Sequence, residues 1–102
     1  MKPLLLLVTY TAKPGMREHF LSEIKESRIL NMIRGEDGCL AYDYFQAAED
    51  ADRLLLVEKW ASQAQQQTHM DQPHMKDLAV IKERWIAQTH VERIYFEEGD
   101  QK

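Results

Sequence analysis

Two strand-like segments at residues 39–45 and 54–60 constrain the fold of this chain more than any other feature. Residues 39–45 alternate along the strand, so Leu40, Tyr42 and Tyr44 are expected to share one face of it. The stretch between the two segments is polar and short, which is typical of a hairpin connection. The sequence therefore predicts an antiparallel strand pair at the centre of the chain.

Helical patterns flank this hairpin. Residues 16–32 carry apolar side chains at helical spacing and charged side chains on the opposite face, which predicts one amphipathic helix. After the hairpin, Ser62 is expected to cap a short helix through Thr68, and Asp71 to cap a second helix with Pro73 in its first turn.

Two further strands are expected at the ends of the chain. Residues 4–12 form an apolar run that stops at Lys13-Pro14-Gly15, and its length suits a strand buried on both faces. Residues 89–96 alternate like a strand. The order β-α-β-β-α-β predicts an α+β, ferredoxin-like fold with a four-stranded antiparallel sheet.

The helices of such a fold cover one face of the sheet. The other face then exposes apolar side chains, and a second copy of the sheet would cover them. We therefore expect a homodimer that forms through this sheet face. The side chains that point to it are those of Ala41, Phe45, Leu55 and Val57.

Length and charge limit the range of functions. The 102 residues support one domain, expected over residues 1–97, followed by a polar tail at 98–102. A net charge of −4 with interleaved signs excludes a basic stripe for nucleic acid. The sequence has neither a secretory h-region nor an apolar run of about 20 residues that could span a membrane. These features predict a cytoplasmic protein.

The run from Leu54 to Lys76 concentrates the side chains that can do chemistry. Glu58 shares a strand face with apolar neighbours, so a buried carboxylate there must be hydrogen-bonded or paired, or its pKa must rise. Trp60, His69 and His74 follow it at the junction of a strand and two helices. We therefore expect the functional site at this junction.

Each of these residues has a structural alternative. His69 could act as a general base near neutral pH, or cap the carbonyls at a helix end. His74 could accept a proton in a first helical turn, where the helix dipole disfavours its charged form. Glu58 could orient an imidazole of His69 or His74, or pair with a cross-strand Arg93.

The aromatic residues have similar alternatives. Trp60 could contact a flat aromatic substrate or simply fill the core. Tyr42 and Tyr44 could line the cavity with their hydroxyls or serve only in packing.

The histidines lack the usual spacing of a metal site, so none is expected, and a Glu-His-His site is kept only as a minor alternative. His69 and His74 are five residues apart across a helix break at Pro73, which is not the i,i+4 spacing that places two imidazoles on one helical face. Cys39 is the one cysteine of the chain, so it offers neither a disulfide nor a cysteine-pair metal site.

The chain resembles the antibiotic biosynthesis monooxygenase (ABM) domain family from its first strand to its last. The order and spacing of the matching segments carry the resemblance. These are Lys13-Pro14-Gly15, the turn and strand from Glu36 to Tyr42, Glu58-Lys59-Trp60, His69, and Pro73-His74-Met75-Lys76.

This resemblance implies a dimeric α+β barrel and an oxidoreductase that needs no cofactor. The expected function is monooxygenation of a small aromatic, quinol-like substrate by O2, with His69 as base, Glu58 and His74 as orienting or proton-shuttling groups, and Trp60, Tyr42 and Tyr44 against the substrate. The family also includes an isomerase of a phosphorylated sugar and haem-degrading enzymes. This chain lacks the Asn and the mid-helix His of the haem-degrading relatives. An isomerase or tautomerase of a small polar or phosphorylated metabolite, or a non-catalytic ligand-binding dimer, are the alternatives.

Overall fold

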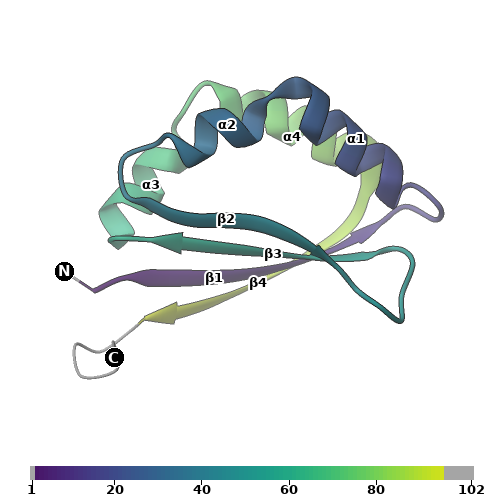
Figure 1. The fold of residues 1–102 in the computed structure, drawn as a ribbon, viewed down its shortest axis with the longest axis horizontal. Coiled ribbons are helices and arrows are strands. Elements are labelled where there is room, and N and C mark those ends of the chain that lie inside the picture. The colour runs from purple at the N-terminus through teal and green to yellow at the C-terminus, as the bar shows by residue number, and fades with distance from the viewer. Residues whose placement is uncertain (1, 96–102) are drawn as a thin grey trace.

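One antiparallel sheet with helices on a single side of it makes up the described chain (Figure 1). The computed structural model describes residues 2–95. The sheet order is β2-β3-β1-β4, and the strands are β1 (Leu4–Ala12), β2 (Cys39–Gln46), β3 (Arg53–Trp60) and β4 (Ile86–Tyr95). This arrangement confirms the predicted ferredoxin-like α+β fold.

The core lies between the sheet and the helices. Along β1 and β3 buried residues alternate strictly with half-buried ones, because successive side chains point to opposite faces. On the inner face Leu4, Leu54 and Leu56 have no exposed surface. The prediction that β1 is buried on both faces is therefore wrong for the described chain, whose outer sheet face is only partly covered.

The first helical segment is broken in two. Helix α1 covers Arg17–Ser27 and α2 covers Ile29–Arg34, with Arg28 between them in the left-handed region at φ 61°. The Arg28 N–H bonds the Lys25 carbonyl and closes α1. The prediction of one continuous helix is wrong, and the break lets α1 and α2 bury Phe20, Ile24, Ile29 and Ile33 against one core.

The second helical segment begins as predicted. The Ser62 hydroxyl accepts the Gln65 N–H and caps α3, which covers Gln63–Met70. Helix α4 covers His74–Trp85, and its N-cap position is Pro73. Asp71 is therefore not the predicted cap of α4; its backbone N–H instead bonds carbonyls at the end of α3.

A bulge in β2 changes which side chains face inward. Cys39 pairs with Trp60 and Ala41 with Lys59, so Leu40 is the extra residue. Leu40 is 56% exposed, whereas Tyr42 is buried. The prediction that Leu40 shares the face of Tyr42 and Tyr44 is therefore wrong for Leu40.

Two further points concern membrane-spanning helices and the C-terminal end of the chain. No helix among the described residues is long and apolar enough to cross a membrane. The predicted tail at residues 98–102, and the predicted strand end at residue 96, lie outside the described residues.

Glycine 38 holds the turn that leads into β2. Its φ is +85°, and its carbonyl accepts the Ala61 N–H at 2.8 Å. A Cβ at this position would lie 2.4–2.8 Å from Gln65, whose amide donates to Asp37 at 3.1 Å. Gly15 has a similar φ of +76° but no atom within 4 Å of its added Cβ.

We expect Gly38→Ala to lower the free energy of unfolding more than Gly15→Ala. The matched control Gly15→Ala should cost about 1–2 kcal/mol from left-handed strain alone. Gly38→Ala adds displacement of Gln65, worth roughly 1 kcal/mol or more. Urea denaturation of both variants measures the difference, and equal losses would contradict the close packing of Gln65 on this turn.

Candidate active site

A cavity of about 130 Å³ lies between the inner sheet face and helices α3 and α4. Its wall includes apolar residues from β1, α3 and α4, and polar groups gather on it from six elements. The polar lining residues are Tyr10, Tyr42, Glu58, Gln66, His69, Lys82, Thr89 and Arg93. The cavity combines an apolar body with convergent polar groups, which is typical of a small-molecule site.

His69 is the imidazole of this wall. It lies in the last turn of α3 and is 1% exposed. The Trp60 ring packs on it at 4.6 Å between centroids, and the Tyr42 ring contacts it edge-on at 5.9 Å. The two aromatic rings hold the imidazole in one orientation. The predicted convergence of Glu58, Trp60 and His69 is found.

Glu36 fixes the tautomer of His69. Its Oε2 lies 2.9 Å from His69 Nδ1, and because a carboxylate oxygen accepts, Nδ1 carries the proton. His69 Nε2 then keeps its lone pair. Its nearest charged neighbour is Glu58 Oε1 at 4.0 Å, which is too far for a hydrogen bond. This arrangement leaves a potential base in the cavity wall.

His74 lies on the far side of Glu36. Its Nε2 is also 2.9 Å from Glu36 Oε2, so two imidazoles donate to one carboxylate oxygen. Glu36 and His74 line a separate hollow of about 380 Å³ together with Met32, Gly35, Asp37, Gln65, Thr68 and Gln72. His74 is therefore connected to His69 only through Glu36, and it reaches solvent from a different side than the cavity.

Glu58 is buried and bonded to Trp60. The indole Nε1–H donates to Glu58 Oε1 at 3.1 Å. Burial raises the pKa of Glu58, and this rise is opposed by the Trp60 hydrogen bond and by electrostatic interactions with His69, Lys82 and Arg93. Arg93 is not a direct cross-strand neighbour of Glu58, because Leu6 of β1 lies between them and pairs with Glu58 on one side and Arg93 on the other. Lys82 shares the cavity, and burial lowers its pKa.

The two tyrosines occupy different places. Tyr42 lines the cavity, and burial holds the pKa of its hydroxyl well above the usual range, so it is a hydrogen-bond donor at neutral pH. Tyr44 lies one layer away, with its ring against Tyr10, Phe20 and Tyr42. Trp60 is fully buried behind His69. A substrate contact of Trp60 or Tyr44 stays a prediction.

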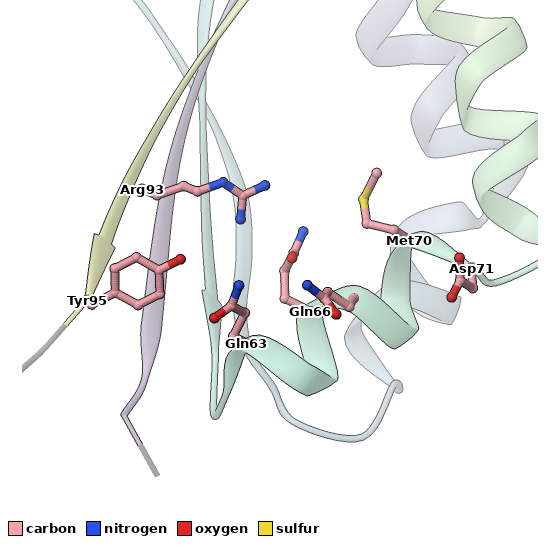
Figure 2. Close-up of a pocket in the computed structure, with 7 residues that line it drawn as sticks. Gln63, Gln66, Met70, Asp71, Arg93 and Tyr95 are labelled. Carbon is pink, nitrogen blue, oxygen red and sulfur yellow. The ribbon is translucent and has the colours of Figure 1, made fainter.

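A second hollow adjoins the cavity (Figure 2). It measures about 380 Å³ and lies between α3 and the end of β4. It shares Gln66, Met70 and Arg93 with the inner cavity, so the two spaces meet at these side chains.

Glu36, His69 and His74 are also a possible metal-ligand set. Their ligand atoms lie within 4.8 Å of one another, and two histidines with a carboxylate form a recurrent iron-binding triad. The five-residue spacing between His69 and His74, which argued against a shared metal site, does not keep their rings apart. The chain turns between α3 and α4, so both rings reach Glu36. Hydrogen bonds alone account for the observed geometry.

Sequence reasoning assigned no role to Glu36, Lys82 or Arg93 in the cavity, apart from considering Arg93 as a strand partner of Glu58. Lys82 has a detectable signal, because it follows the buried Leu78 by four residues and so shares its helical face. Arg93 shares a strand face with Val91. Glu36 has no periodic signal, because it lies in the turn before β2.

Comparison with known proteins identifies the family. The family described as "Antibiotic biosynthesis monooxygenase" (ABM) matches residues 3–80. This match covers the sheet residues of the cavity in β1 to β3 as well as Glu36, His69 and His74. The chain therefore belongs to the antibiotic biosynthesis monooxygenase family, as its sequence resemblance predicted.

Individual relatives are similar to this chain at low sequence identity. A Bacillus subtilis (strain 168) protein named "Putative monooxygenase YcnE" is 31% identical over 64 residues, which are 63% of this chain and 65% of that protein. The chain thus matches less than two thirds of the length of that relative. The crystal structure of PA3566 from Pseudomonas aeruginosa has a TM-score of 0.83 at 27% identity and covers 95% of this chain and 96% of that one. Rv0793 from Mycobacterium tuberculosis shares the fold, with a TM-score of 0.78 at 23% identity over 94% and 96% of the two chains.

We expect Glu58→Gln to stabilise the protein at neutral pH. The folded-state pKa of Glu58 is raised, so the folded state holds this proton more tightly than the unfolded chain. The stability that the protonated Glu58 contributes is present below the pKa of the unfolded chain, about 4.3. It is lost as the pH rises through the pKa of Glu58 in the folded state. A glutamine can keep the bond to Trp60 and carries no charge.

Urea denaturation between pH 4 and pH 8 measures this effect. The gain in stability of Glu58→Gln over the parent should grow with pH. Glu49→Gln, in the exposed β2–β3 connection, is the matched control. It should change the free energy of unfolding by an amount that does not depend on pH. A gain for Glu58→Gln that stays flat across this range would contradict the burial of an ionisable Glu58.

Proposed function

We propose that this chain is a cofactor-independent monooxygenase that acts on a small aromatic, quinol-like substrate. The observation that carries the proposal is the position of His69, whose Nδ1–H is held by Glu36 while Nε2 faces a cavity. Membership of a family described as monooxygenases supports the reaction class. The cavity volume of about 130 Å³ is of the order that holds one aromatic ring.

The first step is removal of the phenolic proton by His69 Nε2. A neutral imidazole with a free ring nitrogen is the most common general base in proteins near neutral pH. Glu58, 4.0 Å from Nε2, would stabilise the imidazolium that forms. The Tyr42 hydroxyl and the Lys82 ammonium lie in the same wall and would stabilise the phenolate.

The second step is oxidation of the phenolate by O2. The electron-rich anion transfers one electron to O2, and the resulting radical pair joins at a ring carbon. The imidazolium of His69 returns its proton to the peroxide oxygen, which gives a hydroperoxide. Loss of water then leaves a carbonyl at that carbon, so one oxygen atom enters the ring and the other leaves as water. The substrate supplies all the electrons in this sequence, and the protein supplies the base and the oxyanion donors.

Glu36 and His74 would allow proton exchange with solvent on the other side of His69. The His69 Nδ1–H and His74 Nε2–H bond the same Glu36 oxygen, and His74 borders a solvent-facing hollow. The reaction releases no net proton, because the proton that Nε2 takes from the phenol returns to the peroxide, so this route would only restore the tautomer of His69 between turnovers. Glu36 and His74 are therefore positioning and proton-exchange groups in this proposal.

We expect His69→Ala to reduce kcat by about 10²–10⁴-fold, the usual contribution of a general base. Oxygen consumption with a panel of quinols and phenols measures the rate. Glu36→Gln should reduce kcat by a smaller factor and shift the pH profile, because the tautomer of His69 is no longer fixed. His90→Ala, at an exposed histidine of β4, is the matched control. An unchanged kcat in His69→Ala would remove His69 as the base.

A second candidate function has one specific observation in its favour. Lys82 and Arg93 both line the cavity, and two cations would suit a phosphorylated or otherwise anionic metabolite. An isomerase or tautomerase would use the same base to move a proton within such a substrate. Turnover without oxygen consumption would identify this reaction and contradict the monooxygenase.

We also propose that the protein forms a homodimer through the outer sheet face. Among the described residues no helix covers this face, and its centre carries apolar side chains at half-buried or exposed positions. A second copy would remove these apolar side chains from water. The face includes Leu5, Leu7, Leu55 and Val57 at its centre and Phe45 on β2.

We expect Phe45→Glu to dissociate this dimer. Phe45 is 53% exposed, so a charge there is tolerated in a monomer but unfavourable between two sheets. Val80→Glu is the matched control, because Val80 is 54% exposed on the outer side of α4. Light scattering after size exclusion should give a monomer mass for Phe45→Glu and a dimer mass for Val80→Glu. The same mass for both variants would exclude this face as the interface.

A further inference from the structure

The outer hollow is lined mainly by hydrogen-bond donors (Figure 2). Arg93 and Tyr95 come from the end of β4, and Gln63 and Gln66 face them from α3. Together they provide a guanidinium, a phenolic hydroxyl and two amides around one space. Gln67 adds a further amide to the same lining.

Among the described residues, Asp71 is the one acidic group that lines this space. Figure 2 shows it beyond Met70, on the side away from Arg93. Glu58 faces the inner cavity, where the Trp60 indole already bonds its Oε1. Within residues 2–95 no carboxylate lies within ion-pair distance of Arg93, whose charge acts on Glu58 over a longer distance. In this part of the chain, the charge around Arg93 therefore favours an anion.

The position of Arg93 relates this space to the reaction. Arg93 lines both the outer hollow and the inner cavity, whose wall contains His69. A ligand that extends from one space to the other would pass beside its guanidinium. Lys82 adds a second positive charge, on the inner side.

We propose that the outer hollow is a binding site for an anionic oxygen group on the substrate, a carboxylate or a phosphate ester, held by Arg93. The proposal rests on the proposed function and names its substrate class: a hydroxylated aromatic ring in the inner cavity that carries an acid group toward Arg93. A guanidinium matches the two oxygens of such a group in a bidentate contact. Gln63, Gln66 and Tyr95 can donate to the remaining lone pairs.

Binding of two nearly isosteric ligands tests the site without any turnover. 4-Hydroxybenzoate and 4-hydroxybenzamide differ in charge and little in shape. Titration calorimetry should show at least tenfold tighter binding of the acid to the parent protein, since hydrogen bonds between charged groups are the stronger kind. Arg93→Gln should abolish this preference, and Arg93→Lys should keep part of it because the charge remains.

Arg53→Gln is the matched control. It removes the same charge at an exposed arginine of β3 that pairs with Asp50, so the preference should persist. A third ligand, 4-hydroxyphenyl phosphate, distinguishes a phosphate ester from a carboxylate. The acid that binds more tightly indicates which anionic group the natural substrate carries. Equal binding of acid and amide to the parent protein, no binding of either, or a preference that survives Arg93→Gln would overturn the site.

The same measurements separate this inference from the proposed reaction. His69→Ala should keep the preference for the acid, because His69 is not part of the outer hollow. If the preference is found but no phenolic acid consumes oxygen, the anion site stands and the monooxygenase fails. If oxygen consumption occurs with uncharged phenols at the same kcat/KM as with their acids, the anion site fails and the monooxygenase stands.

Discussion

The hydrogen bond between Glu36 and His69 is the interaction on which the site depends. It joins the turn before β2 to the last turn of α3, two segments 33 residues apart. Without it, either ring nitrogen of His69 could carry the proton, and no atom in the cavity would be a defined base. Trp60 and Tyr42 fix the orientation of the imidazole ring by packing. The Glu36 carboxylate therefore determines only which ring nitrogen of His69 carries the proton.

The fold could be predicted from the alternation of side chains in the strands and the helical spacing between them. The order of elements and the single covered face both follow from these periods. The break at Arg28 and the bulge at Leu40 could not be predicted. Neither position has a glycine, and each departure is stabilised by packing between elements rather than by local preference.

The candidate site could be predicted only in part. Glu58, Trp60 and His69 belong to one strand and the helix that follows it, so their convergence is a local consequence of chain order. The sequence left the partner of Glu58 open among His69, His74 and Arg93, and it gave no indication that Glu36 is the carboxylate in hydrogen-bond contact with His69. That contact depends on how the turn between α2 and β2 lies against α3, which no short-range pattern encodes.

Two separate hollows border the groups around His69. The outer hollow meets the inner cavity at Gln66, Met70 and Arg93, whereas, among the described residues, the hollow at Glu36 and His74 shares no lining residue with that cavity. Under the proposed function, a substrate bound through the outer hollow would leave the side of Glu36 and His74 in contact with solvent. Proton exchange at Nδ1 of His69 would then not require the product to leave first.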